Sequence, residues 1–202
     1  MKHSSEKQTG FVLLVLLLLF LSFLLGLVYY KVHYEKSFFT YHGFDFTQVP
    51  SGYQMKLYIN QAQQPSLITL RSDPRDLRDI PVDPTVLSLK ETQQIFAIID
   101  PYDNLTGVTT LAVLELDKII DNPFLFNIPV NASFTRPYGD GQLGVKTCDD
   151  APEGTAVLWF RIEQETKVYS EGGCFIIAGV TEDDLIRGVD KILYALLGVI
   201  PL

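Results

Sequence analysis

The chain has 202 residues, with 16 lysines and arginines against 24 aspartates and glutamates, and a formal net charge of −8. Its apolar residues are unevenly spread, because residues 11–30 hold 18 of them. Without this block and the ten residues before it, roughly 44% of the remaining 172 residues are apolar, which is normal for a folded domain with one core. The composition therefore argues against a disordered chain, and the acidic balance argues against a basic nucleic-acid-binding protein.

The apolar block is the first predicted element. Residues 11–30 carry no charge, and only Ser22 and Gly26 interrupt them. Twenty residues at ~1.5 Å each span ~30 Å, the thickness of the hydrocarbon core of a bilayer. Lipid offers the backbone no hydrogen-bond partner, so the segment is predicted to be a transmembrane helix. Ser22 and Gly26 form a small-xxx-small pattern, which allows close packing against another membrane helix.

Two alternatives to an uncleaved anchor remain open. A cleaved signal peptide needs a short apolar core followed by small residues, and this run is long and ends in Tyr29-Tyr30. Gly10-Phe11 resembles the processing site of type IV prepilins, although Thr9 and Val15 replace the basic residue and the glutamate of such sites. The predicted organisation is a cytoplasmic tail at 1–10, a membrane helix at 11–30, a juxtamembrane segment at 31–48 and an extracytoplasmic domain at 49–202.

The side of the membrane on which the domain lies is predicted from three weaker signals, since Lys and Arg are nearly balanced around the apolar run. These signals are the acidity of the domain, a pair of cysteines suited to a disulfide, and two N-glycosylation sequons at Asn104 and Asn131. All three favour a domain outside the cytoplasm.

The domain itself alternates between strand and helix patterns. Alternating or short continuous apolar runs predict strands at residues 53–59, 67–70, 95–99, 124–130, 156–162, 166–169 and 174–178. Residues 107–121 have apolar side chains at helical spacing, and Asn122-Pro123 ends this pattern. The segment 95–130 is therefore predicted to be a parallel βαβ crossover.

The last helix has the clearest boundaries. Thr181 and Asp184 have the spacing of a capping pair, and apolar residues from Leu185 to Leu197 form one stripe before Gly198. We expect this stripe to cover the sheet of the domain. The predicted fold class is α/β, with an N-terminal transmembrane helix followed by one α/β domain whose mixed sheet is covered by at least two helices.

The two cysteines of the chain, Cys148 and Cys174, are predicted to form a disulfide. Loop-closure entropy assigns such a bond a stabilisation of ~3–4 kcal/mol. The pair lacks the CxxC spacing and a nearby histidine, which argues against a catalytic or metal-binding role.

No catalytic or cofactor motif is present. The chain lacks the G-x-S-x-G, P-loop, dinucleotide-binding and H-E-x-x-H patterns, and it has no histidine beyond His42. The acidic residues Asp140, Asp149, Asp150 and Glu153 do not have the spacing of an EF-hand. We therefore predict no catalytic residue, no metal site and no cofactor.

One charged cluster, residues 71–79, contains the three arginines Arg71, Arg75 and Arg78. Their guanidinium groups could bind a phosphate, a carboxylated glycan or a partner protein. Each arginine also has an aspartate within two positions, so the favoured alternative is a self-neutralised surface turn.

The segment from Gly173 to Ile200 resembles the C-terminal tails of uncharacterised archaeal single-span membrane proteins, and Asp73-Pro74-Arg75 is a second point of similarity. The main stretch covers about 28 of the 202 residues. The resemblance implies an archaeal cell-surface setting, but neither an activity nor a functional residue.

Three hypotheses about function remain. The favoured one is a non-enzymatic single-pass membrane protein whose extracytoplasmic domain is a binding or accessory subunit of a cell-envelope complex. Its partners would be the lipid bilayer and another membrane or envelope protein, and no nucleic acid is expected. The second hypothesis is a surface enzyme that acts on glycans through carboxylates. The third is a pilin-like filament subunit.

Overall fold

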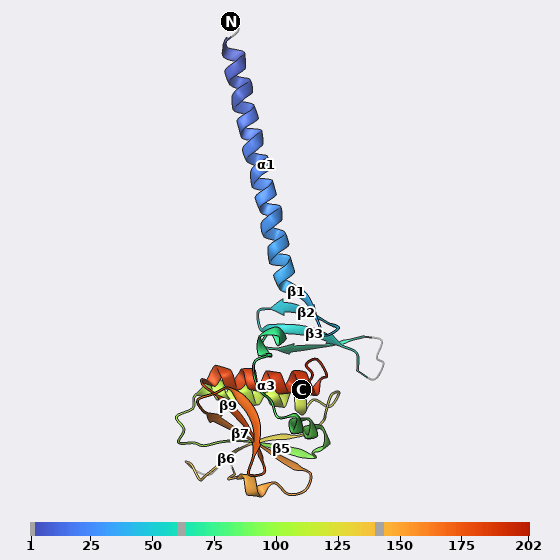
Figure 1. Cartoon of the computed structure of the whole chain (residues 1–202), viewed down its shortest axis with the longest axis vertical. Coiled ribbons are helices and arrows are strands. Elements are labelled where there is room, and N and C mark those ends of the chain that lie inside the picture. Colours follow the sequence, from blue (N-terminus) through green and yellow to red (C-terminus); the bar gives the residue numbers. More distant parts are fainter. Residues whose placement is uncertain (1–2, 60–63, 140–143) are drawn as a thin grey trace. The chain divides into compact units, whose positions relative to one another are not determined.

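The computed structural model describes residues 3–59, 64–139 and 144–202, and for residues 3–13 and 32–36 it describes the backbone alone. Asp140 and the side chains of Gly10-Phe11 therefore lie outside the described residues. The chain divides into two compact units, Met1–Phe39 and Thr40–Leu202 (Figure 1). We refer to Thr40–Leu202 as the head.

The first unit consists almost entirely of the helix α1 (His3–Ser37). Its segment Leu14–Lys31 has a mean hydropathy of 2.2, and 0% of it is buried inside the protein. The Ser22 hydroxyl donates to the carbonyl oxygen of Leu19 at 2.8 Å, and a Cβ added at Gly26 would meet nothing within 4 Å. The helix is long and apolar enough to cross a bilayer, a property that signal sequences near an N-terminus share.

A five-stranded mixed sheet, sheet B, forms one layer of the head and has the strand order β6-β5-β7-β9-β8. Its strands are β5 (Gln94–Ile99), β6 (Val130–Phe134), β7 (Thr155–Ile162), β8 (Lys167–Glu171) and β9 (Cys174–Gly179). All neighbouring strands are parallel except β8, which runs antiparallel to β9. The helix α2 (Gly107–Ile120) joins β5 to the parallel β6, so the predicted β-α-β arrangement is confirmed.

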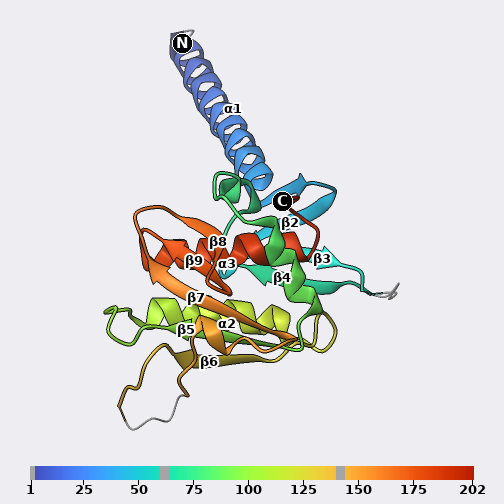
Figure 2. The ribbon, with the colours of Figure 1, turned by 60° about the horizontal axis from the view of Figure 1, so that its bottom comes forward.

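Two helices, α2 and α3 (Glu182–Leu196), pack against each other beside sheet B (Figure 2). Gly188 of α3 lies against Ile177 of β9, and a Cβ at this glycine would be 3.1 Å from the Ile177 side chain. The missing side chain therefore lets the helix approach the sheet closely. The apolar stripe predicted for this helix is buried, as expected.

Glu182 ties the two helices together at their N-termini. Its Oε2 accepts hydrogen bonds from the backbone N–H groups of Thr106 and Thr109, both at 2.9 Å, and from the Thr109 hydroxyl at 2.6 Å. Burial raises the pKa of Glu182, but the hydrogen bonds from Thr109 and Thr106 outweigh burial and hold this pKa below its ordinary value. The carboxylate thus satisfies N–H groups that the first turn of α2 leaves free.

The capping pair predicted from the sequence starts α3. Thr181 Oγ1 accepts from the Asp184 backbone N–H at 3.3 Å, and Asp184 Oδ2 accepts from the Thr181 N–H at 3.1 Å. We expect Thr181→Ala to lower the free energy of unfolding by about 1 kcal/mol, because alanine has no acceptor for this N–H group. Chemical denaturation measures the change, and Thr181→Ser should restore most of the stability. Equal stability of the two variants would contradict the role of the hydroxyl.

A second sheet, sheet A, is antiparallel, has the order β1-β2-β3-β4 and contains β1 (Phe38–Tyr41), β2 (Phe44–Val49), β3 (Gly52–Leu57) and β4 (Ser66–Leu70). Phe46, Met55 and Ile68 are neighbours in register and are buried on one face. The Phe46 ring meets the Tyr194 ring of α3 edge-on, with centroids 5.9 Å apart. Figure 1 shows β2 and β3 on the side of α3 that faces away from β7 and β9, so the helices lie between the two sheets.

The prediction of one mixed sheet is therefore only partly right, because the strands predicted at 53–59 and 67–70 belong to the separate sheet A. Between β4 and β5 the chain forms two 3₁₀ helices, η1 (Pro74–Leu77) and η2 (Pro84–Glu91). Proline cannot donate a backbone hydrogen bond, so this segment interrupts strand pairing. Side-chain alternation identifies a strand but does not identify the strand with which it pairs.

The strand predicted at 124–130 is also wrong, because only Val130 belongs to β6, which continues to Phe134. Before it, the Phe124 N–H donates to Asn122 Oδ1 at 2.9 Å, and the Asn127 N–H donates to the Asn122 carbonyl oxygen at 3.0 Å. Asn127 has a φ of 55°, a left-handed conformation that cannot continue a strand. Turns built on asparagine thus outweigh the strand propensity of the phenylalanines.

A buried carboxyl group joins sheet A to the helix layer. Asp190 of α3 is fully buried, and its Oδ2 accepts a hydrogen bond from the backbone N–H of Ser72, just beyond β4, at 2.7 Å. The Tyr194 hydroxyl donates to the Ser72 carbonyl oxygen at 3.1 Å. Asp190 Oδ1 has no hydrogen-bond partner among the described residues. Burial raises the pKa of Asp190 to about 7, although the hydrogen bonds from Ser72 lower it.

Candidate functional site

Residues 147–151, which we call the covering segment, lie on the face of sheet B that points away from the helices. The covering segment contains the short 3₁₀ helix η3 (Cys148–Asp150), and a disulfide joins Cys148 to Cys174 at the start of β9. Cys148 and Ala151 pack against a buried cluster on this face, which consists of Ile98, Val157, Cys174, Ile176 and Ala178. The predicted disulfide is confirmed, and it holds this covering segment on the sheet.

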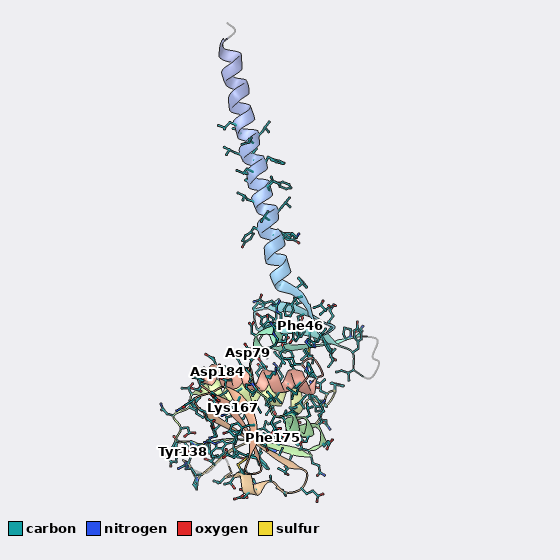
Figure 3. The ribbon with its side chains drawn as sticks, viewed as in Figure 1. Phe46, Asp79, Tyr138, Lys167, Phe175 and Asp184 are labelled. Carbon is teal, nitrogen blue, oxygen red and sulfur yellow. A yellow bond between two sulfur atoms is a disulfide. The ribbon has the colours of Figure 1, made fainter. Side chains whose placement is uncertain are left out.

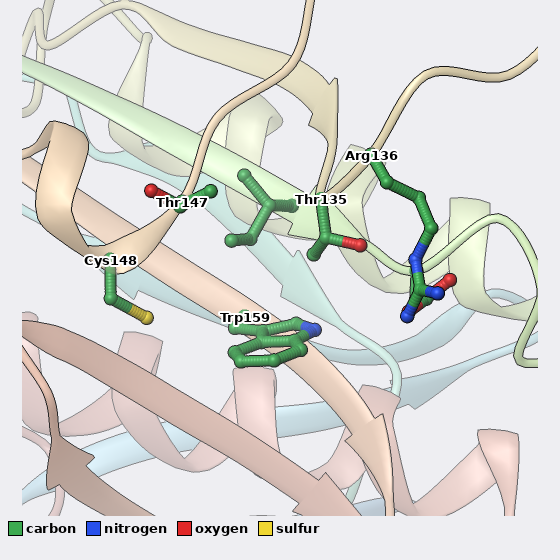
Figure 4. Close-up of a pocket in the computed structure, with 7 residues that line it drawn as sticks. Thr135, Arg136, Thr147, Cys148 and Trp159 are labelled. Carbon is green, nitrogen blue, oxygen red and sulfur yellow. The ribbon is translucent and has the colours of Figure 1, made fainter.

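A pocket of about 420 Å³ opens beside the covering segment (Figure 4). Asp100, Thr135 and Arg136 follow the carboxyl ends of β5 and β6 and line the pocket together with Trp159 of β7. Ile98 of β5 and Thr147 and Cys148 of the covering segment complete it. The volume is in the usual range of small-molecule sites.

The position of the pocket in the sheet is one that α/β folds use for binding. From β5 the chain passes through α2 to β6 on one side, and from β6 it returns to β7 on the other side of β5. The strand order therefore reverses at β5. Open α/β sheets bind ligands near the carboxyl ends of the strands at such a topological switch point.

Two polar atoms of the pocket are buried and make no hydrogen bond to the residues that the structure describes. Thr135 Oγ1 and Trp159 Nε1 have no hydrogen-bond partner within the described part of the chain. In Figure 4 the indole nitrogen is at the end of the ring that is nearer to Thr135 and Arg136. An unsatisfied buried donor or acceptor costs about 1–3 kcal/mol, and native proteins contain few of them. Two such atoms in one pocket mark a place where a ligand could supply the missing hydrogen bonds.

Asp100 and Arg136 form an ion pair in the wall of the pocket. Asp100 is buried; its Oδ2 accepts from Arg136 Nη2, and its Oδ1 accepts from the Tyr102 backbone N–H at 3.0 Å. The guanidinium group of Arg136 lies over the Tyr102 ring, 5.5 Å from its centroid. The pair thus presents N–H donors and carboxylate lone pairs in fixed positions, with no net charge.

Aromatic side chains continue from the pocket to the surface. The Tyr102 and Tyr138 rings meet edge-on at 5.8 Å, and the Tyr138 and Phe134 rings do so at 5.6 Å. Both tyrosines are exposed, and Figure 3 shows Tyr138 at the outer edge of the head. The guanidinium group of Arg161 lies over the Trp159 ring, 4.7 Å from its centroid. Aromatic rings therefore lie both in the pocket and near its mouth.

The three arginines of residues 71–79 are not among the residues that line this pocket, and each contacts a partner of its own. Arg71 Nε donates to Glu115 Oε1 of α2 at 2.9 Å, and Arg75 forms an ion pair with Asp73 at 2.5 Å. Arg78 Nε donates to the carbonyl oxygen of Arg75 at 3.0 Å. These contacts are structural, and ligand contact by the arginines stays a prediction.

The other predicted positions lie on the surface of the head. Asn104 is exposed in the loop after β5, with a φ of 53°, and Asn131 is exposed on β6. Glycosylation of these two residues stays a prediction. Within residues 3–59, 64–139 and 144–202, no three His, Cys, Asp or Glu side chains are grouped as a metal site requires.

The polar residues of the pocket were not predicted from the sequence. Asp100 lies directly after the strand predicted at 95–99, Trp159 lies within the strand predicted at 156–162, and Thr135 and Arg136 lie outside every predicted strand and helix. One signal could have found them, since Asp100 and Thr135-Arg136 come directly after two strands predicted or observed to be parallel neighbours. The carboxyl ends of such strands meet at one edge of a sheet. The misplaced strand at 124–130 hid this relation.

No protein-family model, no curated protein and no solved structure matches the chain. The resemblance of residues 173–200 to archaeal membrane proteins is neither supported nor contradicted by these comparisons and stays a prediction.

Proposed function

We propose that the chain is a single-pass membrane protein whose head lies outside the cytoplasm and binds a small polar ligand, as the binding or accessory subunit of a cell-envelope complex. The observation that carries this proposal is the pocket beside β5 and β6, in which Thr135 Oγ1 and Trp159 Nε1 are buried without a partner among residues 3–59, 64–139 and 144–202. A ligand that bonds to both atoms recovers the free energy lost by burying them.

The charged and sulfur-containing groups of the pocket favour binding over catalysis. Asp100 accepts hydrogen bonds from the Arg136 guanidinium and from the Tyr102 backbone N–H. Both carboxylate oxygens of Asp100 are therefore engaged within the protein, whereas a general acid or base must be placed to exchange a proton with the ligand. Cys148 is engaged in its disulfide to Cys174 and offers no thiolate.

The proposed location is supported by α1 and by the disulfide. Leu14–Lys31 is long and apolar enough to serve as the anchor. Disulfides persist in oxidising compartments outside the cytoplasm, where the Cys148–Cys174 bond would be stable.

Protease added to sealed cells is expected to digest the head without the help of detergent. A thiol reagent is expected to label Cys148 and Cys174 only after reduction, because both are in the disulfide. A head that is cut only after the cells are permeabilised would place it in the cytoplasm and overturn the proposed location.

Binding is measured on the full chain purified in a detergent, through the fluorescence of Trp159, the only tryptophan of the chain. The panel contains neutral sugars, sugar acids, amines, blocked dipeptides and inorganic phosphate. At least one class is expected to change the emission saturably. Thr135→Val keeps the shape of the side chain and is expected to weaken that binding about tenfold, since it removes a hydrogen bond of about 1–2 kcal/mol.

The matched control is Thr110→Val, which removes the same hydroxyl from an exposed position of α2. This variant is expected to bind like the natural chain. The proposed function is overturned when no class produces a saturable response, or when Thr135→Val and Thr110→Val behave alike.

A further inference from the structure

The two pocket atoms that lack a hydrogen-bond partner among the described residues restrict the chemistry of the ligand. Trp159 Nε1 can only donate a hydrogen bond, while Thr135 Oγ1 can donate and accept. The group that meets them must therefore contain an acceptor. An ammonium group has none, so it cannot satisfy the indole.

The charges that line the pocket restrict it further. Arg136 is the one cationic side chain among the described lining residues, and Asp100 already neutralises it. The nearby Arg161 guanidinium, which lies over the Trp159 ring, is paired with Glu163 at 3.6 Å and with Glu171 at 3.8 Å. An anionic ligand would lie next to the Asp100 carboxylate without a free cationic group to pair with. It would also lose its own hydration, which costs free energy. A neutral hydroxyl group avoids this cost, because it accepts from the indole and donates to Thr135 or Asp100.

The rings in and around the pocket restrict the shape of the ligand. The Trp159 ring lines the pocket and has the Arg161 guanidinium over it, and the exposed Tyr102 and Tyr138 rings offer further flat surfaces beside Arg136. The polar groups lie in two places, at Thr135 with Trp159 and at the Asp100–Arg136 pair. A matching ligand has one apolar ring face and several hydroxyl groups around its edge.

From these three restrictions we infer that the ligand is a neutral saccharide whose ring lies against Trp159 and whose neighbouring hydroxyl groups bond to Thr135 and to the Asp100–Arg136 pair. This inference rests on the proposed binding function. The exposed Tyr102 and Tyr138 rings would carry the next sugar unit of an oligosaccharide. The source of the saccharide is then either a free sugar or an envelope polysaccharide.

The experiment uses the full chain in a detergent without a sugar head group, since a glycoside detergent would compete for the pocket. The neutral probes are methyl glucoside, maltose, cellobiose and diacetylchitobiose. The contrasting probes are glucuronate, inorganic phosphate and a blocked dipeptide amide. The fluorescence of Trp159 and saturation-transfer NMR follow the binding of each probe.

At least one neutral saccharide is expected to bind saturably. Thr135→Val and Trp159→Phe are each expected to raise its Kd about tenfold or more, while Thr110→Val leaves the Kd unchanged. Trp159→Phe keeps an aromatic ring but removes the indole N–H, and its binding is followed by NMR because the fluorophore is lost. Circular dichroism confirms that each variant is folded.

A longer oligosaccharide of the same sugar distinguishes the two sources. A Kd that falls with chain length, and that Tyr138→Ala raises for the longer probe alone, indicates a polysaccharide. An unchanged Kd indicates a free sugar. Both results support a saccharide as the ligand.

Three results overturn the inference. Binding of glucuronate, phosphate or the dipeptide amide without any neutral sugar would show that the ligand class is wrong, while the proposed function would stand. Sugar binding that neither Thr135→Val nor Trp159→Phe weakens would place the sugar elsewhere. A complete absence of binding across both probe sets would remove the inference and the proposed function together.

Discussion

Asp190→Asn is expected to raise the free energy of unfolding at pH 8 by roughly 4 kcal/mol and to change it little at pH 4. Burial raises the pKa of Asp190 from its ordinary value of 3.8 to about 7. Below pH ~4 the carboxyl group is protonated in both the folded and the unfolded chain. Between these two pKa values the unfolded chain loses the proton and the folded chain keeps it, so stability falls by about 1.4 kcal/mol per pH unit. Above pH ~7 both states are ionised, and the loss is complete.

Asparagine removes this loss without removing the main contact. Its side-chain oxygen can still accept from the Ser72 backbone N–H, which lies 2.7 Å from Oδ2 in the natural chain. The two charged groups that act on Asp190, Glu115 and Lys118, are unchanged in the variant. A difference between the two pH profiles therefore belongs to residue 190 itself.

Chemical denaturation of the full chain at a series of pH values from 4 to 8 measures the effect. The natural chain should become less stable across this range relative to Asp190→Asn. The control is Asp183→Asn, an exposed residue of the same helix, whose pH profile should parallel that of the natural chain. Parallel profiles for Asp190→Asn and the natural chain would refute the raised pKa.

The second large effect is expected from replacing both Cys148 and Cys174 with serine. The bond joins residues 26 apart in sequence, so its loss frees the unfolded chain and costs about 3–4 kcal/mol of stability by loop-closure entropy. It should also abolish ligand binding. Cys148 and its neighbour Thr147 line the pocket, and without the disulfide nothing covalent holds them on sheet B.

Denaturation and the Trp159 fluorescence titration measure the two consequences separately. Reduction of the natural chain should reproduce the behaviour of the double variant, and reductant should have no effect on the variant itself. A double variant that binds its ligand with an unchanged Kd would show that the covering segment does not need the disulfide to form the pocket.

The sequence predicted the helix α3 most completely. Thr181 is its N-cap, Asp184 completes the capping pair, and the apolar stripe is buried. Each of these features depends on residues within a few positions of one another, so local patterns are enough. The disulfide was also predictable, because two cysteines allow one intramolecular pairing.

The pairing of the strands and the residues of the pocket were predicted less well from the sequence. The strands at 53–59 and 67–70 were recognised, but their separate sheet was not, because pairing depends on partners that local alternation does not identify. At 124–130 the turns built on Asn122 moved the strand toward Phe134. Because the strand was predicted too early in the chain, Thr135 and Arg136 were not recognised as the residues that follow its carboxyl end.

By itself, the sequence determined the long apolar helix α1, the capped helix α3, most strands and the cysteine pair, because regular periodicity and short spacings specify them. Only the tertiary structure decided that the helices lie between two sheets and that Asp100, Thr135 and Trp159 share a pocket. Hydrogen-bond satisfaction is the physical reason. Whether the Thr135 hydroxyl or the Trp159 N–H finds a partner depends on atoms from segments far apart in the chain, which come together only in the folded protein.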